Sequence, residues 1–202
     1  MASIFPSFNS IIFSNPNNLT GLINYNWTRD NSTVVTGIPN TGSGNSLSGI
    51  LSNSSNIQET TTISVIAVSD EGCESDSYNV QVVVNPIPTI SASPATQNIC
   101  SESTITSINI TNTNFVLGTN FSWTKNNTSN ITGIPSTGNG NLITGSLTNN
   151  TTSTQTTRFA ISATSNGCIT STTVDVNVTK ADPPVAQNTY SEEISILKTI
   201  GG

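Results

Sequence analysis

One stretch of this sequence occurs twice, and the two copies stay in register over most of the chain. Each copy contains an Asn-x-x-Trp-Thr segment, then Thr-Gly-Ile-Pro, then a Gly-x-Gly-Asn turn. Trp27 and Trp123 are 96 residues apart (123 − 27 = 96), as are Pro39 and Pro135 (135 − 39 = 96). A Gly-Cys pair further on recurs after 95 residues (168 − 73 = 95). A match this long indicates an internal duplication, and therefore a tandem array of similar domains.

Repeats of this length are the size of a small domain, which sets the expected domain borders. We expect repeat one at residues 1–86 with a truncated first strand, repeat two at 87–181, and a linker with the start of a third repeat at 182–202. The third start is indicated because Ala186–Glu192 resembles Thr96–Glu102, 90 residues earlier (186 − 96 = 90). The first residues lack the basic and apolar segments of a signal peptide, so we expect a segment of a longer protein.

Short alternating segments separated by turn residues predict that each repeat is an all-β sandwich. Tyr78–Val84 and Val174–Val178 alternate with the period of two of a half-buried strand, and no window has sustained helical periodicity. Asn166-Gly167 predicts a tight hairpin between the last two strands of repeat two. Lys125 and Arg158 are interpreted as charges that protect exposed strand edges from pairing with other chains.

The composition excludes several functions. Charged residues make up 8% of the chain, and 11 acids against 5 bases give a net charge of −6. This excess of acids excludes the basic surface with which proteins bind nucleic acid, and it excludes direct contact with an anionic membrane. No apolar run is long enough to span a bilayer. The chain has no His, and no nucleophile lies in a recognisable catalytic motif, so we expect no enzyme and no cofactor.

One acidic cluster could be read as a metal site. Asp70, Glu71, Glu74 and Asp76 surround a turn in repeat one and could offer hard oxygen ligands to Ca²⁺. Their spacing fits no known calcium loop, and the matching turn of repeat two lacks them, so a solvated hairpin tip is the preferred interpretation.

The tryptophans also have two readings. Trp27 and Trp123 could stack on sugars, but their alternation with polar neighbours favours anchors in the two sandwich cores. A carbohydrate-binding module would instead need a cluster of exposed aromatic rings, for which Tyr78, Phe115 and Tyr190 are the candidates.

The three cysteines predict one crosslink. The first strand of a sandwich runs beside its last strand, so Cys100 and Cys168 are predicted to form a disulfide within repeat two. Cys73 corresponds to Cys168, and no Cys stands near Ser3 or Ile4 to pair with it. Cys73 is therefore interpreted as a free thiol, with a Cys73–Cys100 link between domains as the alternative. A disulfide would indicate an oxidising compartment outside the cytoplasm.

These motifs together resemble a known family. The order Asn-Ile-Cys-Ser, Asn-x-x-Trp-Thr, Thr-Gly-Ile-Pro-x-Thr-Gly-x-Gly-Asn, Asn-Gly-Cys and Asn-Pro-x-Pro-Thr is similar to the PKD-like, immunoglobulin-like repeats of giant Bacteroidetes cell-surface adhesins. The resemblance covers residues 1 to about 180. It implies tandem immunoglobulin-like sandwiches, export by type IX secretion, display at the cell surface, and a part in adhesion and gliding motility.

The expected function is therefore that of a structural stalk or spacer. Its partners would be the neighbouring repeats of the same chain and, through the parent protein, a surface polysaccharide or substratum. The alternative is a carbohydrate-binding accessory module of a secreted protein.

Overall fold

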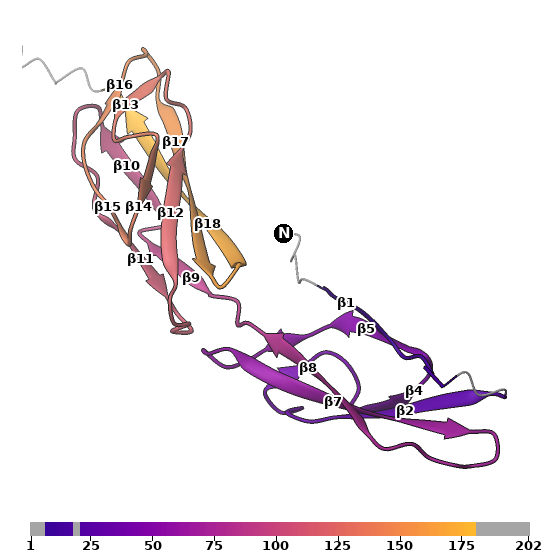
Figure 1. The fold of residues 1–202 in the computed structure, drawn as a ribbon. Helices are drawn as coiled ribbons and strands as arrows, with labels where there is room; N and C mark the ends of the chain where they lie inside the picture. Colours follow the sequence, from indigo (N-terminus) through magenta and orange to yellow (C-terminus); the bar gives the residue numbers. More distant parts are fainter. Residues whose placement is uncertain (1–6, 18–20, 181–202) are drawn as a thin grey trace, which may run out of the picture.

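A computed structural model describes residues 7–17 and 21–180, and every regular element in these ranges is a β-strand. The strands form two groups that lie end to end, β1 to β8 and β9 to β18 (Figure 1), and no sheet combines strands of both groups. The predicted start of a third repeat, residues 182–202, lies outside the described residues. Across the described ranges, no helix is long and apolar enough to span a membrane.

Repeat one is a sandwich of a four-stranded sheet and smaller sheets packed against it. The large sheet has the order β4-β2-β7-β8, and the opposite layer contains the pairs β1-β5 and β3-β6. The bounds are β1 (Ser7–Ile12), β2 (Ile23–Arg29), β3 (Val35–Thr36), β4 (Thr41–Ser43), β5 (Ser46–Ile50), β6 (Ser52–Asn53), β7 (Glu59–Ser69) and β8 (Tyr78–Val84).

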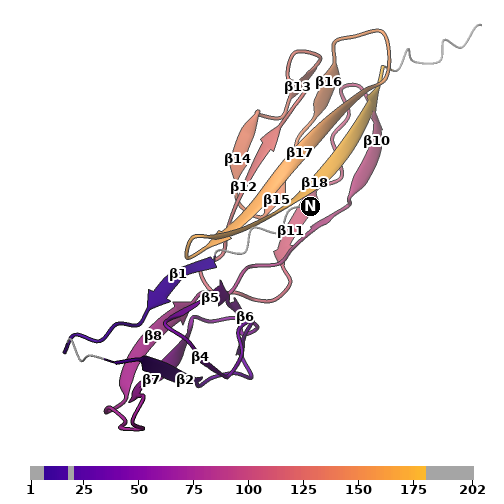
Figure 2. The same cartoon turned by 90° about the vertical axis from the view of Figure 1, so that its right-hand side faces the viewer.

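Repeat two has the same architecture with two further strands at its beginning. Its large sheet has the order β10-β18-β17-β12-β14, and the opposite layer contains β15-β11-β9 and β13-β16 (Figure 2). The bounds are β9 (Ile90–Ser93), β10 (Thr96–Cys100), β11 (Ile108–Asn112), β12 (Asn120–Lys125), β13 (Ile131–Gly133), β14 (Thr137–Asn139), β15 (Leu142–Ile143), β16 (Leu147–Asn149), β17 (Gln155–Ser165) and β18 (Cys168–Thr179).

Each repeat buries its own hydrophobic core, with its tryptophan inside. Trp27 belongs to the core of repeat one and Trp123 to that of repeat two. Trp123 packs edge-on against Phe159, with 5.8 Å between ring centroids. The rings also explain the Gly-x-Gly-Asn turns, because a Cβ on Gly42 or Gly138 would collide with the facing indole. The predicted interpretation of both tryptophans as core anchors agrees with this placement.

The interpretation of Lys125 and Arg158 as protectors of strand edges is wrong. Lys125 ends β12 on its inner face, is 6% exposed, and donates from Nζ to the carbonyl of Ile131 at 3.0 Å. Burial lowers the pKa of this amine. Arg158 lies on β17, inside the five-stranded sheet, and pairs with Asp175 on β18 at 2.7 Å. That hydrogen bond lowers the pKa of the Asp175 carboxyl.

Candidate functional site: the junction between the repeats

The linker between the repeats is held by both domains. It runs from Asn85 to Thr89, between the end of β8 and the start of β9. Its two prolines, Pro86 and Pro88, are buried and Ile87 is half-buried. A proline has a fixed φ and no backbone N–H, so two buried prolines give a stiff connection that leaves no buried donor unpaired.

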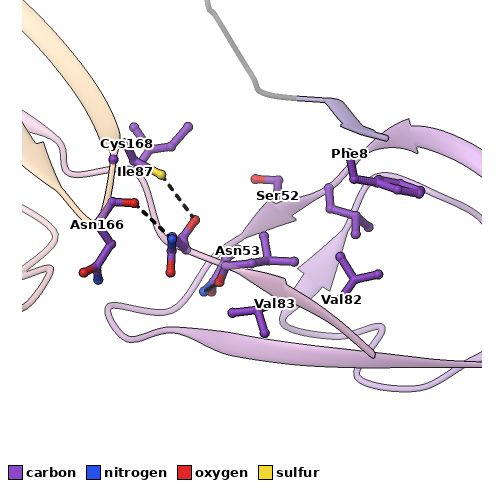
Figure 3. Close-up of a pocket in the computed structure, with 12 residues that line it drawn as sticks. Phe8, Ser52, Asn53, Val82, Val83, Ile87, Asn166 and Cys168 are labelled. Atoms are coloured by element: carbon purple, nitrogen blue, oxygen red, sulfur yellow. Dashed lines mark hydrogen bonds between the residues drawn. The ribbon is translucent and has the colours of Figure 1, made fainter. Parts of the chain in front are cut away.

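Asn85 connects the last strand of repeat one to the hairpin tip of repeat two. Its Nδ2 donates to the carbonyl of Asn166 at 3.0 Å, and its Oδ1 accepts from Nε2 of Gln58 at 2.7 Å. The thiol of Cys168 lies 3.9 Å from the Asn85 carbonyl (Figure 3). The tip reaches this far because Asn166 and Gly167 both have positive φ, which closes the tight turn that their sequence predicts. The predicted hairpin is confirmed.

A second loop of repeat two holds the other end of the linker. The side chain of Asn114 donates to the carbonyl of Ile87 at 2.9 Å and accepts from the amide of Thr89 at 2.8 Å. Nearby, the amide of Leu117 donates to the carbonyl of Asn56 in repeat one at 3.3 Å. Two separate loops of repeat two therefore contact the linker and repeat one, and they restrain the junction at more than one point.

A pocket of about 300 Å³ lies beside this junction (Figure 3). Its walls are mostly apolar side chains of repeat one, closed at one end by the hairpin tip of repeat two. The lining residues are Phe8, Leu51, Ser52, Asn53, Val82, Val83, Val84, Asn85, Ile87, Asn166, Gly167 and Cys168.

The predicted disulfide is wrong, and all three cysteines are free thiols. β10, the second strand of repeat two, does lie beside the last strand β18, but Cys100 lies opposite Thr179 at one end of β18. Cys168 begins β18 at the other end. Eleven residues of strand place them about 36 Å apart, whereas a disulfide needs Cα atoms within about 7 Å. Cys73 is exposed on the turn between β7 and β8, so neither predicted pairing forms.

We expect Cys168 to report on whether the junction is closed. It is half-buried and burial raises its pKa, so its thiolate fraction at neutral pH is small. In the unreduced native protein, three thiols should react per chain, with Cys168 slower than the exposed Cys100. Asn85→Ala should speed alkylation of Cys168 about fivefold, because a lost hydrogen bond is worth about 1 kcal/mol. Peptide mapping by mass spectrometry measures each rate, and equal acceleration at Cys100 would contradict a local effect.

The other predicted site residues do not converge. Among the residues that the structure describes, no group of three or more acids and thiols could hold a metal ion, so Asp70, Glu71, Glu74 and Asp76 form no metal centre. The exposed rings of Tyr78 and Phe115 belong to different repeats, at the far end of β8 and in a loop of repeat two, so they form no common platform. The third aromatic candidate, Tyr190, lies outside the described part of the chain.

Sequence reasoning missed the roles of Asn85, Asn114 and Asn166 at the junction. Asn is abundant throughout this chain, so no single Asn stands out. Their positions in the sequence could have indicated these roles. Asn85 is the first residue of the Asn-Pro-x-Pro linker, and Asn166 lies at a hairpin tip that a neighbouring domain can contact.

A family comparison agrees with this architecture. The model of the PKD-like domain matches the chain twice, at residues 11–88 and 97–182. The chain belongs to the PKD-like domain family. The predicted fold class, tandem immunoglobulin-like sandwiches, is confirmed, and this family assignment brings no enzyme class with it.

Solved structures similar to this chain are also tandem domains, at low identity. Domains 4 and 5 of the S-layer protein SbsC are 16% identical, with a TM-score of 0.32 over 83% of this chain and 79% of that one. The amphioxus IgVJ-C2 molecule is 16% identical, with a TM-score of 0.31 over 85% and 96%. Titin Ig tandem domains are 13% identical, with a TM-score of 0.28 over 78% and 82%. These scores carry no argument about function, and no curated protein matches the chain.

Proposed function

We propose that this chain is a section of stalk: two PKD-like spacer domains of a large exported protein that adheres at the cell surface. The observation that supports this most is the junction, where buried linker prolines and hydrogen bonds from two loops of repeat two hold the domains end to end. A chain of separately folded domains with stiff, short connections makes a long spacer that transmits tension.

The surface chemistry supports the same role. The chain carries few charges and many Asn, Ser and Thr side chains, which keep an extended protein hydrated without strong attraction to nucleic acid or anionic lipid. The motif resemblance extends the proposal to a surface adhesin of the Bacteroidetes, of the kind to which the gliding-motility adhesin SprB belongs. Its partners would then be the neighbouring repeats, and its location outside the cell.

Small-angle X-ray scattering tests the spacer role. The native chain should behave as one elongated particle with a narrow distribution of domain orientations. Replacing Pro86 and Pro88 together by glycine should broaden that distribution and lower the mean end-to-end distance, because glycine frees the backbone that proline fixes. A native chain as broad as the double variant would contradict a stiff spacer. Antibodies against the chain that fail to label intact source cells would contradict surface display.

The alternative, a carbohydrate-binding module, makes a different prediction. A glycan array or polysaccharide pull-down should then show binding that is lost in Tyr78→Ala or Phe115→Ala. The spacer proposal expects no binding to depend on either ring, because the two rings lie apart.

A further inference from the structure

The sequence contains two Asn-Gly dipeptides, and both lie in repeat two. Asn139 ends β14 and Gly140 follows it, whereas Asn166 and Gly167 form the tip of the hairpin between β17 and β18. Repeat one has Ser43-Gly44 and Glu71-Gly72 at the corresponding positions. Chemistry that needs an asparagine before a glycine is therefore confined to repeat two.

An Asn-Gly dipeptide can modify itself without an enzyme. The backbone nitrogen of the glycine bonds to the side-chain carbonyl carbon of the asparagine, and the side-chain amide leaves as ammonia, which takes up the proton of the glycine N–H. Water then opens the five-membered succinimide ring. Opening at the side-chain carbonyl gives aspartate, and opening at the backbone carbonyl gives isoaspartate, whose peptide bond runs through the former side chain. Glycine is the favoured neighbour because it has no Cβ beside the attacking nitrogen.

The two dipeptides differ in whether the attacking nitrogen is free. The amide of Gly140 donates to the carbonyl of Phe121 at 3.0 Å, and this hydrogen bond retains the proton that must leave. Across residues 7–17 and 21–180, neither the amide of Gly167 nor the side chain of Asn166 makes a hydrogen bond. Asn166 is exposed, and its side-chain amide points away from the linker (Figure 3). Both reacting groups of the hairpin tip are therefore available.

We propose that Asn166 is a site of spontaneous deamidation, and that the isoaspartate it forms loosens the junction between the repeats. The tip contacts the linker through the Asn166 carbonyl, which accepts from Nδ2 of Asn85 at 3.0 Å. Isoaspartate puts one more atom into the backbone and converts this carbonyl into a free carboxylate. The turn spans only two residues between the paired Ser165 and Cys168, so the added atom displaces the tip from its contact with Asn85.

Peptide mapping by mass spectrometry tests the site of reaction. The folded native chain is incubated at mildly alkaline pH, and the deamidated peptides are separated by chromatography into aspartyl and isoaspartyl forms. Asn166 should deamidate about fivefold faster than Asn139, because the Gly140 amide must first give up its hydrogen bond. Equal rates in the folded chain, or a faster reaction at Asn139, would overturn the proposal.

Unfolding the chain provides the matched control. In guanidinium chloride the hydrogen bond from Gly140 to Phe121 is absent, so Asn139 and Asn166 should deamidate at similar rates. A ratio of rates that is the same in folded and unfolded chains would show that the neighbouring sequence sets the rates, and it would overturn the structural explanation.

Small-angle X-ray scattering tests the effect on the junction. Aged native protein should show a broader distribution of domain orientations than fresh protein, and fresh Asn85→Ala should resemble the aged native protein. Asn166→Gly is the control variant. It removes the carbonyl carbon that is attacked but keeps the backbone carbonyl that Asn85 contacts, at a positive φ that glycine adopts freely. Its distribution should not change with age. Equal broadening of aged native protein and aged Asn166→Gly, or no broadening of either, would overturn the effect on the junction.

Discussion

Replacing Gly133 by alanine should unfold repeat two and leave repeat one folded. Gly133 has a φ of +108°, a conformation that L side chains rarely adopt. A Cβ there would collide with the carbonyl oxygen of Ser146, just before the residue that pairs with Gly133. Since both groups belong to the backbone of paired strands, neither can move aside. We expect a loss of about 4 kcal/mol or more, which is among the largest effects of a single substitution.

The single tryptophan in each repeat makes this measurable. Fluorescence during urea unfolding reports repeat two in a Trp27→Phe background and repeat one in a Trp123→Phe background. Gly140→Ala is the matched control, because its φ is +100° but nothing lies within 4 Å of the added Cβ. It should cost about 1–2 kcal/mol, the strain of the conformation alone. Similar losses for Gly133→Ala and Gly140→Ala would contradict the steric argument.

The same collision explains why Thr-Gly-Ile-Pro occurs in both repeats. In repeat one, a Cβ on Gly37, at a φ of +115°, would collide with the carbonyl of Ile50. The duplication therefore predicted that this tetrapeptide matters, and the structure supplies the reason. Period-two alternation likewise predicted β8 with its observed bounds, because a strand buried on one face alternates in composition.

The disulfide could not be predicted because the sequence does not specify strand direction. The segment that ends at Cys100 does lie beside the last strand, as expected, but this segment, β10, runs parallel to β18. Parallel pairing brings the end of β10, at Cys100, to the end of β18, whereas Cys168 is at the beginning. An antiparallel pair would have brought the two cysteines to the same end. The alternation of side chains between the two faces of a strand is the same in parallel and antiparallel pairs, so it does not indicate the direction of a strand.

The buried cations were predictable in principle. Arg29 and Lys125 follow Trp27 and Trp123 by two residues, which places each on the same face as its tryptophan. The Arg29 guanidinium donates to the carbonyl of Val35 at 2.6 Å, as Lys125 does to that of Ile131. The interpretation of Lys125 as a charge that protects a strand edge did not take this shared face into account. Such a cation stays buried because it satisfies carbonyls that the short strands leave without partners.

Asn149→Ala should destabilise repeat two by about 3 kcal/mol, because four hydrogen bonds made by one buried side chain are lost together. Asn149 is 4% exposed. Its Nδ2 donates to the carbonyls of Ser153 and Val178, each at 2.8 Å. Its Oδ1 accepts from the amide and the hydroxyl of Thr151, at 2.9 and 2.8 Å. The side chain thus fastens the loop between β16 and β17 to the end of β18.

The corresponding asparagine of repeat one tests whether this stabilising role is common to both repeats. Asn53, 96 residues earlier (149 − 53 = 96), donates to the carbonyls of Ile57 and Val84 and accepts from the amide of Ser55. Asn53→Ala should therefore destabilise repeat one to a similar or slightly smaller extent, as measured by urea unfolding. Asn150→Ala is the control, because its exposed side chain makes one long contact of 3.4 Å and should change stability by less than about 0.5 kcal/mol. If Asn150→Ala and Asn149→Ala proved equally harmful, loss of a polar loop residue alone would explain the result, and the buried hydrogen bonds would not.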